Sequence, residues 1–116
     1  NLKNLLDDFV KVDGINSVVV IGRDGFVIES AGNSVSNDVE AVGAVISTGV
    51  GSSEVMGSEL SVGQMSQSMV EYEQGMIMAN LLGRDAILAV VASIQANLGN
   101  VRYQLKKRAP EIERAL

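Results

Sequence analysis

The chain has 116 residues, of which 47% are hydrophobic and 20% charged, and this length suits one domain, spanning 1–116, that buries roughly two-thirds of its unfolded surface. It has no histidine and no cysteine, so the commonest general base, the commonest metal ligands and thiolate nucleophiles are missing, and we expect no catalytic residue, no metal and no cofactor. The net charge of −5 argues against nucleic-acid binding, no apolar run is long enough to insert into a membrane, and the absence of cysteine and of a signal-peptide pattern suits the cytoplasm.

The first element is predicted to be a helix, because apolar residues recur at steps of three and four over residues 2–12 and Gly14 stands where a helix often ends. Two strand-like runs follow, Ser17–Gly22 and Phe26–Ser30, with Arg23–Gly25 between them. A short loop containing Asp-Gly between two such runs indicates a β-hairpin.

A long helix is predicted from Asp38 to about Leu60, with Asn37 as its N-cap and Glu40 completing a capping box. At about 100° per residue, one of its faces is apolar enough to pack on a sheet. This face comprises Val39, Val42, Ile46, Val50, Ser53, Gly57 and Leu60, flanked by Val45 and Met56.

The opposite face of this helix holds small and weakly polar residues, with no charge between Glu40 and Glu54. Glycines inside a helix each cost up to about 1 kcal/mol relative to alanine, so their presence suggests a surface that another body approaches closely. We predict that a second copy of the chain covers this face; the alternative is that part of the stretch is a loop. The predicted dimer interface comprises Ala44, Ser47, Thr48, Gly51, Val55 and Ser58.

Three more strand-like runs follow the long helix. Val62–Glu73 is polar and weakly alternating, as an edge strand is, whereas Met76–Leu82 and Ala86–Ser93 are apolar. Tight turns at Glu73–Gly75 and Gly83–Asp85 separate them, which predicts an antiparallel meander.

The last element is predicted to be a helix that begins after Asn97, and Pro110 is expected to kink or interrupt it. The complete order is therefore helix, two strands, helix, three strands, helix. We predict an α+β fold in which a five-stranded antiparallel sheet lies between the long middle helix and the N- and C-terminal helices.

Two further patterns have ordinary structural explanations. Gly49–Ser53 lacks the lysine of a phosphate-binding loop and falls inside the predicted helix. A group of basic residues in the last helix is typical of a solvated face, with an anionic membrane or an acidic partner as the alternative. This group comprises Arg102, Lys106, Lys107 and Arg108.

The order and spacing of several short motifs resemble the roadblock/dynein-light-chain family, which includes MglB-type regulators of Ras-like GTPases. The motifs are Leu5-Leu6, Asp13–Ile15, Arg23–Ser30, the Gly-, Ala- and Ser-rich helix after Val39, and Gly83–Asp85. The resemblance implies a homodimer in which the middle helices lie side by side and the third strands pair into a ten-stranded sheet. It thereby adds Met65, Ser66 and Ser68 to the expected dimer interface.

The same resemblance implies a non-catalytic role: binding a Ras-like small GTPase and modulating its nucleotide hydrolysis or localisation, or scaffolding a larger complex. The paired middle helices are expected to form the partner-binding surface, ringed by acidic residues and without basic groups. The alternative is a small-ligand sensing domain with a molecule bound between sheet and helix. The acidic residues expected to bind the partner are Asp38, Glu40, Glu54 and Glu59.

Overall fold

Residues 1–33 and 39–116 are described by the computed structural model, and over these residues the chain forms three helices and five strands. The fold class and the order of elements predicted from the sequence are confirmed. The elements are α1 (Leu2–Phe9), β1 (Ile15–Gly22), β2 (Val27–Gly32), α2 (Val39–Glu59), β3 (Ser68–Tyr72), β4 (Gly75–Leu82), β5 (Ala86–Ser93) and α3 (Leu98–Arg114).

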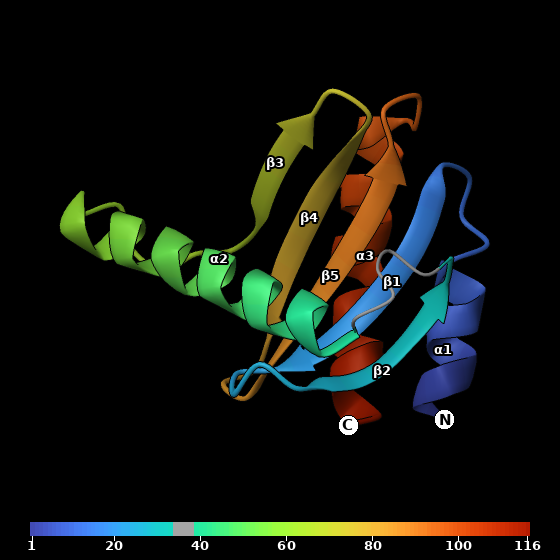
Figure 1. The fold of residues 1–116 in the computed structure, drawn as a ribbon, viewed down its shortest axis with the longest axis horizontal. Helices are drawn as coiled ribbons and strands as arrows, with labels where there is room; N and C mark the ends of the chain where they lie inside the picture. Colours follow the sequence, from blue (N-terminus) through green and yellow to red (C-terminus); the bar gives the residue numbers. More distant parts are fainter. Residues whose placement is uncertain (34–38) are drawn as a thin grey trace.

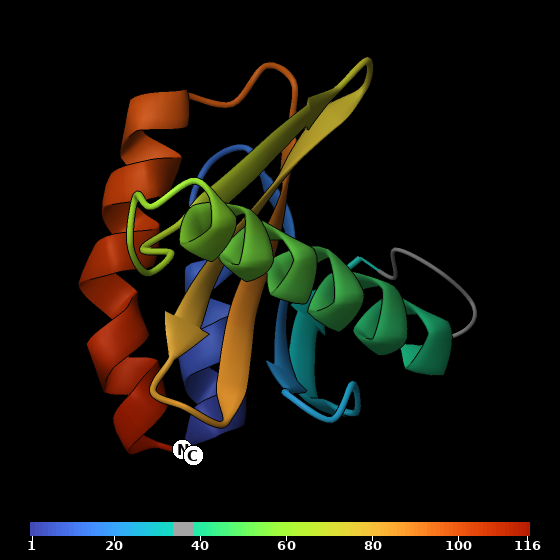
Figure 2. The ribbon, with the colours of Figure 1, turned by 90° about the vertical axis from the view of Figure 1, so that its left-hand side faces the viewer.

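The strands form one antiparallel sheet in the order β2-β1-β5-β4-β3. Its centre is built from the β-branched runs of β1 and β5, which pair with Val18 opposite Val90 and Val20 opposite Leu88. The helix α2 covers one face of the sheet, while α1 and α3 cover the other (Figures 1 and 2). At its C-terminal end, α2 extends beyond the edge of the sheet formed by β3 (Figure 1).

The face under α1 and α3 holds the larger hydrophobic core. Alternate residues of the strands point to it, and the apolar stripe predicted for the last helix is buried against them. That helix begins after the Asn97 cap as predicted, but it continues through Pro110 to Arg114, so the proline does not interrupt it. Pro110 lies on the exposed side of α3, where its ring displaces no core residue.

The face under α2 holds a thinner core of Val19, Ile21, Val50, Ala79, Ile87 and Ala89. The prediction that Leu60 packs on the sheet is wrong, because its side chain is 73% exposed. Leu60 follows the last turn of α2, beyond the edge of the sheet. The flanking Val45 and Met56 are also exposed, at 70% and 57%. The predicted N-cap Asn37 lies outside the described residues.

The segment from residue 60 to 67 is a loop rather than the start of the third strand, which begins six residues later than predicted. Ser61 and Gly63 have positive φ angles of 58° and 94°, which turn the chain back from the end of α2. The loop is tied down at Gln67. Its Nε2 donates to Oδ1 of the buried Asn80 at 3.0 Å, and its Oε1 accepts from Nε of Arg102 on α3 at 3.2 Å.

Candidate functional site

The outward surface of α2 is apolar and uncovered. Val45, Val55, Met56 and Leu60 are exposed, and a Cβ atom built at Gly49 or Gly51 would meet nothing within 4 Å. The outer side of a surface helix usually carries charged side chains, whereas this one exposes several apolar residues that no other described residue covers.

The free edge of the sheet at β3 continues this surface. β3 is hydrogen-bonded to β4 on one side, and its Met69, Val70 and Tyr72 are exposed. The other edge strand, β2, also exposes an apolar side chain, Ile28, but α1 packs beside it and Lys3 Nζ donates to the carbonyl oxygen of Ser30 at 2.6 Å. Among the described residues, β3 is therefore the edge with no covering contact and is the more accessible one for pairing.

The two flanks of α2 differ in character. At about 100° per residue from the buried Val50, the exposed Val45, Met56 and Leu60 lie on one flank. Glu54 and Ser58 lie on the opposite flank, which faces the β1–β2 and β4–β5 turns and lines a cleft of about 820 Å³.

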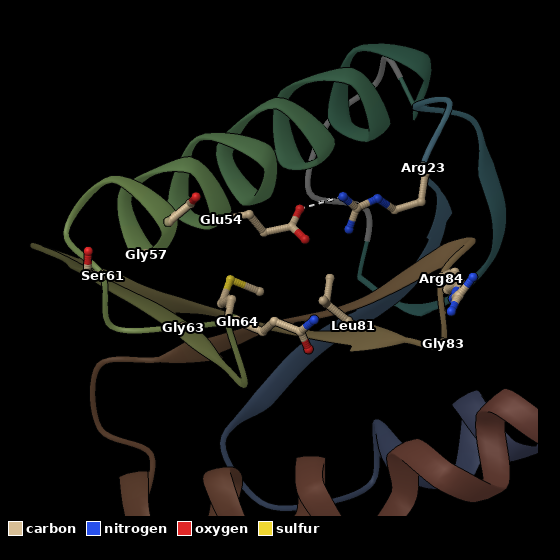
Figure 3. A pocket seen from close by; sticks show the side chains of 11 residues that line it. Arg23, Glu54, Gly57, Ser61, Gly63, Gln64, Leu81, Gly83 and Arg84 are labelled. Carbon is tan, nitrogen blue, oxygen red and sulfur yellow. Dashed lines mark hydrogen bonds and ion pairs between the residues drawn. The ribbon is translucent and has the colours of Figure 1, made fainter.

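This cleft combines charged and apolar groups (Figure 3). Arg23, from the β1–β2 turn, forms an ion pair with Glu54 of α2. Arg84 lies at the far end of the cleft on the β4–β5 turn, and Met65 and Leu81 supply apolar surface. The complete lining is Arg23, Glu54, Gly57, Ser58, Ser61, Gly63, Gln64, Met65, Leu81, Gly83 and Arg84.

The expectation that the acidic surface of α2 lacks basic groups is wrong. Because β1 and β5 are antiparallel neighbours, the two arginine-bearing turns lie together, and the N–H of Arg23 donates to the carbonyl oxygen of Asp85 at 2.9 Å. The sequence showed two turns that each contain Arg-Asp, but only the strand order places them side by side and beneath α2.

The acidic residues predicted for partner binding differ in their exposure to solvent. Glu40 and Glu59 are exposed, Glu54 is half-buried in its ion pair with Arg23, and Asp38 lies outside the described residues.

Most residues predicted for the dimer interface are accessible, but they are not equivalent. Met65 packs against the core under α2 and so points into its own protomer. Ala44, Thr48, Val55, Ser58 and Ser66 are exposed, whereas Ser47, Gly51, Met65 and Ser68 are half-buried.

The described residues contain no group of three or more acidic side chains placed to hold a metal ion. Within residues 1–33 and 39–116, no helix is long and apolar enough to cross a membrane.

Comparison with known proteins gives consistent matches. A family model described as the Roadblock/LC7 domain matches residues 2–92. Two uncharacterized proteins of Methanocaldococcus jannaschii, MJ0310 and MJ1340, are each 34% identical over 112 residues, which is 97% of this chain and 96% of theirs.

Among solved structures, Myxococcus xanthus MglB superposes with a TM-score of 0.90 at 18% identity, over 98% of this chain and 93% of that chain. A Roadblock/LC7 domain from Streptomyces avermitilis gives a TM-score of 0.89 at 20% identity, over 99% and 97% of the two chains. At these identities the structural matches establish the fold.

Proposed function

Because this chain belongs to the Roadblock/LC7 domain family, we propose that it works as a non-catalytic homodimer in the cytoplasm that binds a Ras-like small GTPase. In this role it modulates the nucleotide hydrolysis or the localisation of the GTPase. The observation that carries the proposal is the apolar surface that runs from the outer side of α2 to the free edge of β3.

A second copy of the chain would cover the outer side of α2 and pair with the free edge of β3 at the same time. Antiparallel pairing of two β3 edges requires a two-fold axis perpendicular to the sheet, which keeps both α2 helices on the same face. The end of each α2, which extends past β3 (Figure 1), then lies over the sheet of its partner. The flank bearing Val45, Met56 and Leu60 is turned away from the cleft and is the apolar flank available for this contact.

The GTPase would bind to the composite surface of the paired helices, which occurs once per dimer. Glu40 and Glu59 are exposed on α2 and in this arrangement would rim the composite surface, so a partner with a basic rim would be steered toward it, at a rate that falls as salt screens the field. One dimer is therefore expected to bind one GTPase.

The dimer is tested with Met56→Glu, because Met56 is exposed in one protomer and its replacement costs little unless a second copy covers it. Burying an unpaired carboxylate at an interface costs several kcal/mol. Light scattering at micromolar concentration should give about twice 12.2 kDa for the wild type and the monomer mass for this variant.

The matched control is Ile94→Glu, an exposed apolar residue between β5 and α3, which should stay dimeric. Gly51→Glu tests the other side of α2, which the sequence alone favoured. Dimers of unchanged affinity in both the Met56 and the Gly51 variants would contradict an α2 interface.

GTPase binding is tested with the double reversal Glu40→Lys, Glu59→Lys, which leaves the proposed dimer contact intact. With a Ras-like GTPase loaded with GDP or a GTP analogue, surface plasmon resonance should show association slowed about tenfold. The reversal Glu111→Lys, Glu113→Lys on α3 makes the same change in charge and should bind normally. Failure of the wild type to bind in either nucleotide state would refute the GTPase partner.

The cleft favours a second candidate function, the sensing of a small anionic ligand. Its volume of about 820 Å³ falls in the usual range for ligand sites, and Arg84 has no ion pair among the described residues. Native mass spectrometry of the purified protein tests it: an organic anion retained by the wild type and lost in Arg84→Ala would support sensing, and a ligand-free wild type would count against it.

A further inference from the structure

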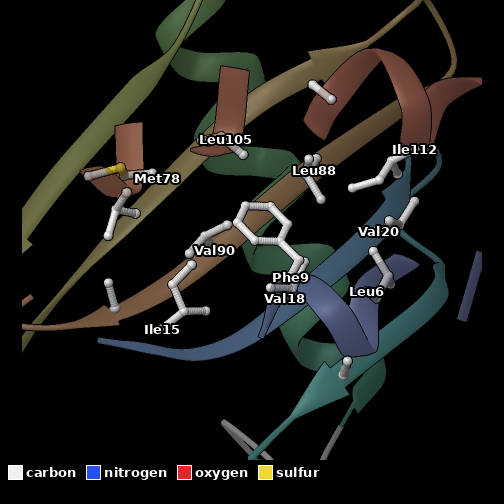
Figure 4. Packing of buried hydrophobic residues seen from close by; sticks show 14 of the residues in the cluster. Leu6, Phe9, Ile15, Val18, Val20, Met78, Leu88, Val90, Leu105 and Ile112 are labelled. Carbon is white, nitrogen blue, oxygen red and sulfur yellow. The ribbon is translucent and has the colours of Figure 1, made fainter. Parts of the chain in front are cut away.

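The helix α3 has a buried side and a free side. Leu105 and Ile112 point into the core beneath the sheet (Figure 4), and both are almost completely buried. The opposite side of α3 faces solvent, on the face of the molecule away from α2 (Figures 1 and 2). It is therefore separate from the proposed GTPase surface.

The free side of α3 carries a net positive charge in an acidic protein, because the exposed Arg102, Lys106, Lys107 and Arg114 outnumber the exposed Glu111 and Glu113. Between Asp85 and Glu111 the chain has no Asp or Glu, although the net charge of the whole chain is −5. None of the basic side chains in this interval has an acidic partner among the described residues. These are Arg102, Lys106, Lys107 and Arg108, which we call the α3 basic face.

The contacts made by the two arginines leave their charge in place. Arg102 and Arg108 donate to the neutral amides of Gln67 and Gln104, at 3.2 and 3.0 Å, and the guanidinium of Arg108 also lies 5.2 Å from the centroid of the Phe9 ring. By contrast, Lys3 of α1 and Lys11, two residues after α1, each pair with an aspartate at 3.5 Å.

The outermost part of this face is amphipathic. The ring of Tyr103 is 58% exposed, and the Nζ of Lys107 lies 5.9 Å from its centroid. A tyrosine beside lysines with long apolar stems is the combination that suits the headgroup layer of a bilayer. The hollow beside α3 is only about 250 Å³ and is lined by both Lys106 and Glu113, so it offers no basic groove for an acidic peptide.

The proposed dimer brings two such faces together. A two-fold axis perpendicular to the sheet leaves both α3 helices on the same side of the assembly, opposite the α2 helices. One flat anionic surface can then contact both basic faces at once, so the second contact is intramolecular and strengthens the first.

We propose that the α3 basic face binds the anionic lipid headgroups of a membrane surface, holding the protein peripherally without insertion. The bivalent form of this binding rests on the homodimer of the proposed function. Each basic residue near an anionic surface strengthens binding by roughly fivefold. The contact is convex and needs no groove, and it leaves the α2 surface free.

Sedimentation with vesicles tests the proposal. The full chain should bind vesicles of phosphatidylcholine with about 30% phosphatidylglycerol, should not bind pure phosphatidylcholine, and should dissociate when salt rises from about 0.1 to 0.5 M. The variant Lys106→Gln, Lys107→Gln should bind at least tenfold more weakly. Lys3→Gln, Lys11→Gln removes the same charge from two exposed lysines that each pair with an aspartate and should change binding less than threefold.

Equal binding to both kinds of vesicle, or an unchanged Lys106, Lys107 variant, would overturn the proposal. Tighter, Lys106- and Lys107-dependent binding to duplex DNA or to polyglutamate would also overturn it, in favour of an acidic macromolecule. Light scattering on the same sample separates the two proposals: a monomer that still binds anionic vesicles refutes only the dimer, and a dimer that does not bind refutes only the membrane contact.

Discussion

The two faces of the sheet are covered to different degrees by the same chain. Under α1 and α3, side chains such as Leu6, Phe9 and Leu105 are completely buried. Under α2, Val50 is buried, but Val45 and Met56 on the same helix are exposed. One face is therefore buried within a single chain, whereas the other leaves apolar side chains exposed, and these are the side chains that the proposed dimer covers.

The largest loss of stability is expected from a substitution in the core under α1 and α3. Phe9→Ala removes a fully buried ring and should lower the free energy of unfolding by about 3–5 kcal/mol. The matched change Val45→Ala alters an exposed side chain on α2 and should cost less than about 1 kcal/mol in dilute, monomeric samples. Urea titration at two protein concentrations measures both, and equal losses would remove the contrast between the faces.

Two glycines of α2 allow the buried and the exposed side of one helix to be compared. A Cβ at Gly43 would collide with the carbonyl oxygen of Gly25, so Gly43→Ala should destabilise the protein by about 1–3 kcal/mol. Gly49 has open space around it, so Gly49→Ala should stabilise the isolated protomer by up to about 1 kcal/mol through helix propensity.

The Gly49 variant also reports on the partner. If a second copy packs closely against Gly49, the added methyl group should weaken the dimer while the monomer gains thermal stability. Chemical denaturation of dilute samples and dissociation constants from ultracentrifugation separate these effects. A variant that gains stability equally at all concentrations would show that nothing approaches this position.

The smallest contribution to stability is expected from the ion pair in the cleft. The side chains of Arg23 and Glu54 are 36% and 29% exposed, so water screens their attraction and the pair should be worth about 0.2–1 kcal/mol. A double-mutant cycle with Arg23→Ala and Glu54→Ala measures it. A coupling energy well above this range would mean that the cleft is a rigid part of the fold rather than an adaptable part of the surface.

Local patterns in the sequence were sufficient for the elements and for the larger core. The β-branched run of β1 is continuously apolar, as in a strand buried on both faces, and the apolar stripe of α3 has the helical period, so their burial follows from these local patterns. The position of Leu60 could not be obtained in this way. Helical periodicity shows which residues share a face, but not where the sheet beneath them ends.

The cleft was missed for a related reason. Arg23 and Arg84 are 61 positions apart in the printed sequence, and each is explained locally by its turn. Their proximity to Glu54 depends on β1 lying next to β5 and on α2 crossing above that end of the sheet. The sequence therefore predicted an α2 surface without basic groups, whereas the folded chain places Arg23 beside Glu54.

Gln67 connects the two sides of the protein. Its side-chain amide joins Asn80 of the sheet to Arg102 of the α3 basic face, and its backbone belongs to the loop that leaves the end of α2. A displacement of that loop would change the anchorage of Arg102, and a shift of Arg102 would in turn act on the loop. Any such coupling is reciprocal: an event at the α2 surface that alters affinity at α3 is matched by an equal effect in the reverse direction.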